Sequence, residues 1–404
     1  MSRNNFIEKL LDGVEVEWKA VSEIFHLKNG YTPLTSKKEF WEGGSIPWFR
    51  MDDIRKNGQI LNDSLQKISE SAVKGGKLFP ANSIIIATSA TIGEHALITV
   101  PYLANQRFTC LSLKEAYVET FDIKFIFYYF FLLADWCKKN TTMSSFASVD
   151  MDGFRKFQIP IPCPENPKKS LEIQAEIVRI LDAFTALTAE LTAELTAELT
   201  ARKKQYNYYR DQLLSFDEGE VEWKTLGGVV EINTGQKPSE ILETATEFDY
   251  INAGTTRSGY ATGYNCEGDT ITTPSRGQGG IGFVGYQKEP FWLGPLCYKM
   301  RSLDEAILTN KYLFYFLQSK SELLLYLKKE GGVPAVNKSD LAKLEIPLPP
   351  INKQKRIVTI LDKFDALTNS ISEGLPREIE LRQKQYEYYR DLLLSFPKPE
   401  EIEA

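Results

Sequence analysis

Side chains with hydroxyl, amide and guanidinium groups occur together in three short, turn-prone segments: Asn105–Arg107, Thr255–Ser258 and Arg276–Gln278. Such groups can read the edges of DNA bases, because Arg or Lys donates two hydrogen bonds to guanine and Asn or Gln pairs with adenine. Arginines and lysines on loops are more commonly just solvated, so no single segment establishes DNA binding. The candidate base-contacting residues, in these segments and in other local loops, are Lys37, Lys38, Arg50, Arg55, Lys77, Asn105, Gln106, Arg107, Thr256, Arg257, Ser258, Arg276, Gln278 and Lys299.

Sequence patterns of catalysis are scarce. The chain has two histidines, His26 and His95, and five cysteines without a Cys-x-x-Cys pair, which argues against a metal site. We find no P-loop, no G-x-S-x-G, no H-E-x-x-H and no N-P-P-aromatic tetrapeptide. The stretch 277–282 matches G-x-G-x-x-G, but strand-like sequence follows it where a dinucleotide site needs a helix, so we interpret it as a glycine-rich turn. The sequence therefore predicts a protein that is not itself an enzyme and holds no metal.

The composition is that of a globular protein without an overall basic surface. The 404 residues include 48 Lys+Arg and 54 Asp+Glu, giving a formal net charge of −6, and 43% are hydrophobic. Any DNA contact must therefore come from local loops. The odd number of cysteines favours a reducing compartment, and the longest nearly apolar run, 125–134, is shorter than the ~20 residues that span a bilayer. We expect a cytoplasmic protein with no membrane partner.

The sequence repeats internally. EVEWK occurs at 15–19 and at 220–224, an offset of 205 residues, whereas RKKQYNYYRDQLLSF from Arg202 matches RQKQYEYYRDLLLSF from Arg382 at an offset of 180 residues. The changing offset means that segments of variable length alternate with segments of fixed length. We divide the chain into 1–157, 158–216, 217–345 and 346–404.

The two fixed-length segments have helical periodicity. Each begins with a proline-rich motif, IPIPCPENP or IPLPPI, and continues with apolar residues at steps of three and four. A helix with a single apolar stripe must bury that stripe against another surface, and we expect the other helical segment to provide this surface. This predicts a helix pair about 60 Å long. Gly374 and Pro376 should bend or break the second copy.

Three TAEL repeats occupy residues 188–199 of the first helical segment. Ala, Glu and Leu are strong helix formers, and each four-residue unit adds about 6 Å to a helix. The repeat can be read as low-complexity helical filler, but its place between two like modules favours a spacer. The spacer residues that we single out are Thr188, Leu191, Leu195 and Leu199.

The two variable segments have mixed patterns. Short β-rich runs stand between glycines and prolines, and each segment has an aromatic-rich helix, at 121–137 and 310–327, whose aromatic residues we expect in the core. The predicted fold class is therefore α+β. It has two mixed α/β domains separated by two long antiparallel helices, a coiled-coil pair, with a pseudo-twofold internal repeat.

This arrangement resembles the DNA specificity subunit of type I restriction–modification systems over essentially the whole chain, and the TAEL spacer resembles the type IC group. The likeness also rests on GYTP at 30–33, FWEGGSIPWFRMDDI at 40–54, ATSATIG at 87–93 and NQRF at 105–108. The second domain departs from this pattern, because GQKP at 235–238 is a loose version of the first loop and no W-x-G-G-x-I-P-W follows.

The resemblance implies a non-catalytic subunit that binds double-stranded DNA, with 1–157 and 217–345 as target-recognition domains that each read half of a bipartite, asymmetric site. It adds Tyr31 and Thr32 to the DNA-binding candidates. The implied partners are two methyltransferase subunits, which use S-adenosylmethionine to methylate adenine N6, and two restriction subunits, which need ATP and Mg²⁺. The chain itself would hold no cofactor.

The resemblance also suggests where the methyltransferases dock, namely on the repeated RxKQYxYYRDxLLSF faces. Packing between the helices explains the same residues equally well. The docking candidates are Tyr206, Tyr209, Arg210, Tyr386, Tyr389 and Arg390. Two other functions stay open from sequence: a fused methyltransferase–recognition fragment with its own cofactor site, and a coiled-coil scaffold that binds no nucleic acid.

Overall fold

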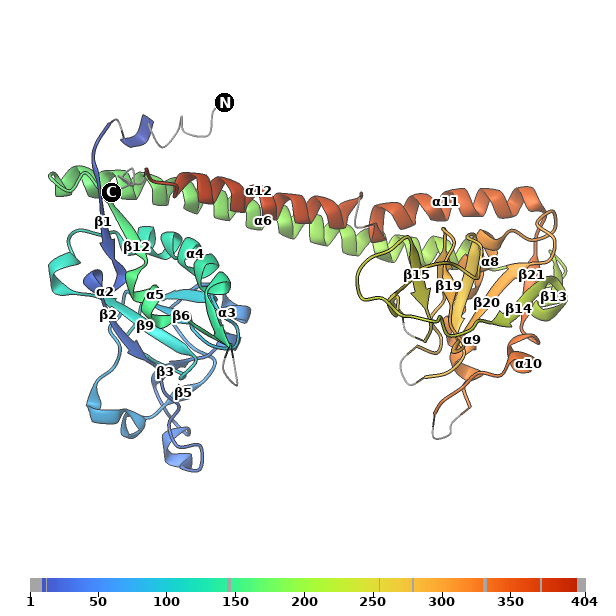
Figure 1. The fold of residues 1–404 in the computed structure, drawn as a ribbon, viewed down its shortest axis with the longest axis horizontal. Coiled ribbons are helices and arrows are strands. Elements are labelled where there is room, and N and C mark those ends of the chain that lie inside the picture. The colour runs from blue at the N-terminus through green and yellow to red at the C-terminus, as the bar shows by residue number, and fades with distance from the viewer. Residues whose placement is uncertain are drawn as a thin grey trace. The chain divides into compact units, whose positions relative to one another are not determined.

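The computed structural model describes residues 9–11, 13–143, 147–253, 255–277, 280–329, 333–370 and 373–397. The chain forms two compact units: unit 1 contains residues 1–191 and 381–404, and unit 2 contains residues 192–380. Each unit has one α/β module and parts of the long helices, as Figure 1 shows. The predicted α+β class with an internal repeat is confirmed.

The module of unit 1 is built on a five-stranded sheet, with the order β2-β9-β6-β7-β4, and a three-stranded sheet, with the order β5-β3-β8. Its helices are α2 (Val21–Ile24), α3 (Met51–Asn57), α4 (Ile123–Lys139) and α5 (Met151–Lys156). Its strands are β1 (Val16–Ala20), β2 (Phe25–Asn29), β3 (Ile46–Phe49), β4 (Ile60–Leu61), β5 (Lys67–Ile68), β6 (Ser83–Ala87), β7 (His95–Ile98), β8 (Leu103–Ala104), β9 (Phe108–Leu113), β10 (Thr141–Met143), β11 (Ala147–Val149) and β12 (Gln158–Pro162).

The central strand of this sheet is buried on both faces. Because successive strand residues point to opposite faces, Ile84 and Ile86 of β6 pack with the aromatic residues of α4, whereas Ile85 packs with Met51 and Ile54 of α3. The expectation that the aromatic-rich helix belongs to the core is confirmed, since nine residues of α4 are buried.

The module of unit 2 repeats this plan with a four-stranded sheet, β14-β20-β17-β18, and a three-stranded sheet, β16-β15-β19. Its strands are β13 (Glu222–Thr225), β14 (Val230–Thr234), β15 (Phe248–Ile251), β16 (Tyr260–Ala261), β17 (Thr270–Pro274), β18 (Gly285–Gln287), β19 (Trp292–Leu293), β20 (Cys297–Ser302) and β21 (Glu345–Leu348). Its short helices are α7 (Leu226–Val229), α8 (Asn310–Ser319), α9 (Ser321–Tyr326) and α10 (Lys338–Leu341). The aromatic residues of α8 are in its core, as expected.

Each module is closed by a two-stranded sheet that joins its first and last strands. In unit 1, β1 pairs with β12 so that Trp18 lies opposite Pro160. In unit 2, β13 pairs with β21 so that Trp223 lies opposite Pro347. The EVEWK and proline-rich motifs are therefore partners of one another. The sequence-based interpretation of the prolines only as the approach to a helix missed this pairing.

The first helical segment forms one continuous helix, α6 (Pro167–Leu213), of 47 residues, or about 70 Å. The second forms α11 (Ile351–Asn369) and α12 (Leu375–Leu393), and Gly374 between them has a φ of +84°. Glycine adopts this left-handed conformation readily, and the predicted break is confirmed. Helix α6 pairs with α12 in unit 1, where Phe184 packs on Tyr389, and with α11 in unit 2.

The residues at and after the end of α12 pack into the core of unit 1. Leu393, Leu394 and Phe396 are buried there, and the Phe396 ring lies 5.8 Å from that of Phe125 on α4. Trp18 of β1 donates its indole N–H to the carbonyl oxygen of Pro397 at 3.3 Å. Unit 1 is therefore assembled from two distant stretches of chain.

A buried glutamine fastens the helical frame to the module in each unit. The Gln174 side chain of α6 accepts a hydrogen bond from the backbone N–H of Asp122 at 2.9 Å and donates one to the carbonyl oxygen of Thr120 at 2.9 Å. The Gln354 side chain of α11 likewise accepts a hydrogen bond from the backbone N–H of Thr309 at 3.0 Å and donates one to the carbonyl oxygen of Ile307 at 2.7 Å. Both glutamines have no exposed surface.

An aspartate eight residues, or about two turns, further along each helix adds a second anchor. Asp182 accepts a hydrogen bond from the Tyr128 hydroxyl at 2.8 Å, and Asp362 accepts one from the Tyr315 hydroxyl at 2.5 Å. Burial raises the pKa of both tyrosine hydroxyls, so that they remain protonated donors. The matching anchors show that the repeat preserves the contacts between module and helix.

His95 of β7 is buried beneath α4. Its Nδ1 and Nε2 atoms each lie 3.3 Å from a backbone carbonyl oxygen, of Gly93 and Phe127 respectively, and its ring packs against Phe131. Burial disfavours the charged imidazolium and lowers the pKa of His95 from 6.5 to about 4.

Unit 1 should consequently lose stability when the pH falls from about 6.5 towards 4. In this range the unfolded chain binds a proton at His95 and the folded chain does not. The stabilisation is therefore complete above the unfolded pKa and is lost towards the folded pKa, by about 3 kcal/mol over the range. Thermal melts at pH 7.5 and pH 5 should show a smaller acid-induced loss for His95→Phe than for the wild type. Equal losses in both proteins would contradict this role.

Candidate nucleic-acid interface

The same glycine-led loop follows the first strand of the large sheet in both modules. In unit 1 a Cβ added to Gly30 would lie 2.2 Å from the carbonyl oxygen of Asn105, and in unit 2 a Cβ added to Gly235 would lie 1.9 Å from that of Leu293. Only glycine permits these approaches. The next residue in each loop then hydrogen-bonds to the facing strand, β8 or β19. The motif at 235–238 is therefore in the same place as GYTP, despite its divergent sequence.

In unit 1 this loop meets the turn between β8 and β9. The Thr32 hydroxyl donates a hydrogen bond to the side-chain oxygen of Gln106, and the side-chain oxygen of Asn105 accepts one from the backbone N–H of Arg107 at 3.0 Å. Gln106 and Arg107 are exposed, whereas Thr32 and Asn105 are half-buried. The structure thus brings these four candidates together at one edge of the module.

Arg50 stands at the start of α3, where its backbone N–H donates to Asp53 at 2.6 Å. Its guanidinium lies 5.6 Å from the centre of the Trp48 ring, and its Nε atom is buried without a hydrogen-bond partner among the described residues. The Asp53 carboxylate is itself fully buried and also accepts from the backbone N–H of Leu65 at 2.6 Å. This network fixes the position from which Arg50 extends.

Two of the other candidates in unit 1 make internal contacts. The Tyr31 hydroxyl donates to the carbonyl oxygen of Ala72 at 3.2 Å and accepts from the backbone N–H of Lys74 at 2.8 Å, which makes it a support of the loop. Lys37 pairs with Glu39 at 3.6 Å. Besides Gln106 and Arg107, the exposed candidates of unit 1 are Lys37, Lys38, Arg55 and Lys77.

In unit 2 the exposed Arg257 guanidinium lies 3.5 Å from the Asp249 carboxylate and 4.5 Å from the centre of the Tyr260 ring. Lys299 is half-buried and pairs with Glu231 at 3.6 Å. Gln278 lies outside the described residues. The remaining candidates of this unit, all exposed, are Thr256, Ser258 and Arg276.

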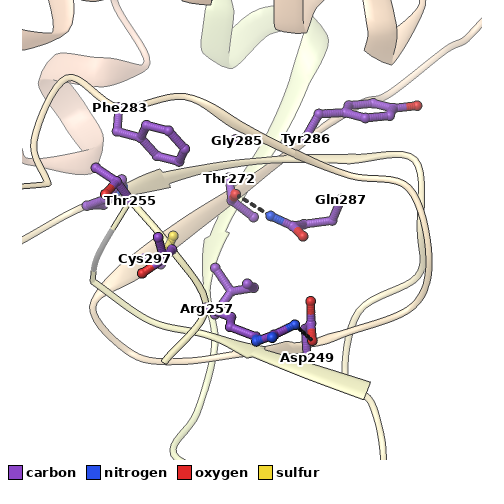
Figure 2. A pocket seen from close by; sticks show the side chains of 12 residues that line it. Asp249, Thr255, Arg257, Thr272, Phe283, Gly285, Tyr286, Gln287 and Cys297 are labelled. Carbon is purple, nitrogen blue, oxygen red and sulfur yellow. Dashed lines mark hydrogen bonds and ion pairs between the residues drawn. The ribbon is translucent and has the colours of Figure 1, made fainter. Parts of the chain in front are cut away.

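Beside Arg257 is a pocket of about 460 Å³ between β15, the residues that follow it, and the β17–β18 part of the large sheet (Figure 2). Asp249, Thr272 and Gln287 contribute polar side chains to its lining. Sequence analysis did not single out these three residues, because no local motif marks them and they meet only through the pairing of distant strands.

The docking candidates divide into buried and exposed residues. Tyr206 and Arg390 are each 6% exposed, so that they pack inside their own units, Arg390 over the Phe131 ring at 4.3 Å. Tyr209 and Tyr389, in contrast, are 43% and 42% exposed. The other two candidates make contacts on the helices: Tyr386 bonds to the hydroxyl of Thr185 at 3.0 Å, and Arg210 lies over the Tyr206 ring at 5.7 Å.

Within the part of the chain that the structure describes, no three His, Cys, Asp or Glu side chains are grouped in a way that could hold a metal ion. Over the same residues, no helix combines the length and the apolar character needed to cross a bilayer.

Two modules with one strand plan, each joined to the same long helix and each with polar, exposed loops, define a duplicated recognition protein. Residues 13–201 and 218–381 match the type I restriction modification DNA specificity domain, and the chain belongs to this family. It is a specificity subunit, a non-catalytic component that recognises DNA within a restriction–modification complex. Family membership decides against the scaffold and the fused methyltransferase fragment.

Relatives and solved structures agree with this assignment. The chain is 56% identical over 387 residues to the specificity subunit of the type I restriction enzyme EcoprrI of Escherichia coli, covering 92% of this chain and 93% of that one. It is 39% identical to the EcoR124I/EcoR124II specificity subunit of Escherichia coli over the full length of both. A chain in a solved structure of type I R-M complex assembly has a TM-score of 0.66 at 16% identity, covers 94% of this chain and 97% of that one, and shows the same fold.

Proposed function

We propose that each module reads one half of a bipartite, asymmetric site in double-stranded DNA, and that partner subunits in the cytoplasm then methylate adenine N6 or restrict the DNA. The observation that carries the proposal is that the two modules share the pairing of their central strands and a glycine-led loop but differ in the side chains at equivalent positions. Ile85 pairs with Cys110 in unit 1 as Thr272 pairs with Lys299 in unit 2. Two modules with the same backbone frame but different side chains would contact different base sequences, as two different half-sites require.

The partners in this proposal are two methyltransferase subunits, which bring S-adenosylmethionine, and two restriction subunits, which bring ATP and Mg²⁺. The repeat supports two copies of one methyltransferase, because Tyr209 and Tyr389 occupy equivalent positions, 180 residues apart in the sequence, and are equally exposed. Each would offer an aromatic contact of the type that is enriched in protein interfaces. Tyr206 and Arg390 hold their own units together instead.

The spacer in this proposal is the TAEL stretch of α6. It is helical throughout, and Thr188, Leu191, Leu195 and Leu199 are half-buried. The threonine hydroxyls of its later units bond back along the helix, as Thr196 does to the carbonyl oxygen of Thr192 at 2.7 Å. A continuous helix transmits length directly, because each residue adds a fixed rise.

Methylation mapping tests the proposal. DNA from cells that express this chain with its matching methyltransferase should carry a bipartite methyl-adenine motif, and the motif should vanish when this chain alone is removed. Single-molecule sequencing would read both half-sites and the gap. An unchanged methylation pattern, in cells where the complex demonstrably assembles, would refute the proposal.

A further inference from the structure

The pocket of unit 2 lies where the module of unit 1 is filled. Between β3 and β5, unit 1 inserts the seventeen residues 50–66, which include α3 and β4. Between the corresponding strands β15 and β16, unit 2 has only the eight residues 252–259, and those of them that the structure describes form no helix. Among the described residues of this connection, none belongs to a helix that could fill the space that Met51 and Ile54 of α3 occupy in unit 1.

The floor of this space has changed in the same way. The strand pairing equates Ile85 and Phe108 in unit 1 with Thr272 and Cys297 in unit 2. It also equates Ile98 of β7 with Gln287 of β18. All three unit 1 side chains are buried in one apolar cluster, whereas their three counterparts line the pocket. The helix and the apolar floor residues of unit 1 are thus replaced together in unit 2. A binding pocket requires both changes, whereas shortening of the connection alone would not require polar residues on the floor.

The polar groups of the pocket suit an uncharged ligand. Figure 2 shows Gln287 and Thr272 on one side of the hollow and Arg257 with Asp249 on the other. The Gln287 amide donates to the Thr272 hydroxyl at 3.2 Å, which fixes its orientation. Arg257 and Asp249 are 3.5 Å apart, so their charges offset one another. The lining therefore offers both donors and acceptors without a net charge.

The apolar part of the lining suits a flat ring. Phe283, at 38% exposed, stands at the edge of the hollow, and its backbone is held by a hydrogen bond from the Thr273 hydroxyl at 2.8 Å. The Tyr286 hydroxyl, by contrast, bonds to Asp269 and points away from the hollow in Figure 2. Proteins read an unstacked base by combining hydrogen bonds to its edge with an aromatic or apolar face.

We propose that this pocket binds a nucleobase, with the Gln287 amide reading the base edge and Phe283 contacting the ring. The base has two possible sources, an extruded base of the DNA bound by unit 2 or a free nucleoside. The first source rests on the proposed function of unit 2 as a reader of DNA, and the second does not.

Both sources can be tested with the full chain in complex with its methyltransferase. Ligand-detected NMR with adenosine, guanosine, cytidine and thymidine tests the free form. Duplexes in which each base of the mapped unit 2 half-site is replaced in turn by 2-aminopurine test the extruded form, since this base fluoresces when it leaves the stack. We expect a pocket-dependent signal in at least one of the two experiments.

Three variants identify signals from the pocket. Gln287→Ala removes the proposed reading group and should weaken base binding by about fivefold, the effect of one hydrogen bond. Thr272→Ile with Cys297→Phe fills the pocket with the residues that unit 1 uses at these positions and should abolish the signal. Glu345→Ala, at the exposed start of β21, which neither lines the pocket nor belongs to the proposed docking faces, should change nothing. A fluorescence increase caused by the methyltransferase would persist in all three.

Each outcome has a defined meaning. A 2-aminopurine signal that the filled pocket abolishes supports an extruded base, and nucleoside binding without that signal supports a free one. If neither signal depends on Gln287 or on the filled pocket, while the wild-type complex still binds its mapped duplex, the nucleobase proposal is wrong and the proposed DNA-reading function stands.

Discussion

Deletion of one TAEL unit, residues 192–195, should bring the two recognised half-sites one or two base pairs closer together and leave the bases read in each half unchanged. Four helical residues account for about 6 Å of rise and one turn plus about 40°, and one base pair accounts for about 3.4 Å of duplex. The modules themselves lose no residue. Binding to the original spacing should fall by a factor on the order of 10² or more, because two linked sites lose their joint advantage when the geometry forbids simultaneous contact.

Methylation mapping of the deletion variant would measure this change directly. The matched control keeps the length and alters the sequence: Thr192→Ala with Thr196→Ala should leave the gap as it is, since alanine is at least as good a helix former as threonine. Insertion of one further TAEL unit should lengthen the gap by the same step. A gap that ignores the number of repeats would eliminate the spacer hypothesis without affecting the reading of each half-site.

Replacement of either buried glutamine, Gln174 or Gln354, should cause a large loss of stability in its own unit. Gln354→Ala would strand the backbone N–H of Thr309 and the carbonyl oxygens of Ile307 and Pro349, to which the amide is bonded at 2.7–3.0 Å. An unsatisfied buried polar group costs about 1–3 kcal/mol, and a small cavity adds to this. We expect unit 2 to lose at least about 3 kcal/mol.

Hydrogen exchange followed by mass spectrometry would localise the effect. Gln354→Ala should increase exchange in α8 and β21 of unit 2, whereas Gln174→Ala should do so in α4 and β12 of unit 1. Each variant is thus the control for the other. Gln383→Ala removes the side-chain amide of an exposed glutamine and should leave the exchange of both units unchanged. A uniform increase over both units, or none, would disprove the view that each glutamine clamps its own unit.

The parts of the fold that sequence predicts well are those determined by local patterns. The TAEL stretch is helical because strong helix formers recur without a break. The second helical segment is interrupted between Asn369 and Leu375, where Gly374 has a left-handed backbone conformation that glycine adopts readily. The aromatic helices lie in the core because apolar residues occupy most of their circumference, and such a helix is stable only when it is buried.

The parts that sequence could not predict depend on distant contacts. The pairing of Trp18 with Pro160 joins residues on either side of a whole module, and no local pattern encodes such a partner. Similarly, Tyr206 and Tyr209 are alike in sequence, yet one is 6% and the other 43% exposed. The pocket beside Arg257 lies where unit 1 has helix α3, a difference that becomes visible only when the strand pairing of the two modules is compared.

The return of the chain's last helix into unit 1 sets the order in which the protein is finished as it is made. A ribosome releases all of residues 192–380, which form unit 2, before it releases 381–396, which supply Leu393, Leu394 and Phe396 to the core of unit 1. Domains usually fold as units from the N-terminus onwards during synthesis. Here the unit whose synthesis begins first is completed last. Phe125 and its neighbours lack their packing partners near Phe396 until after all residues of unit 2 have been synthesised.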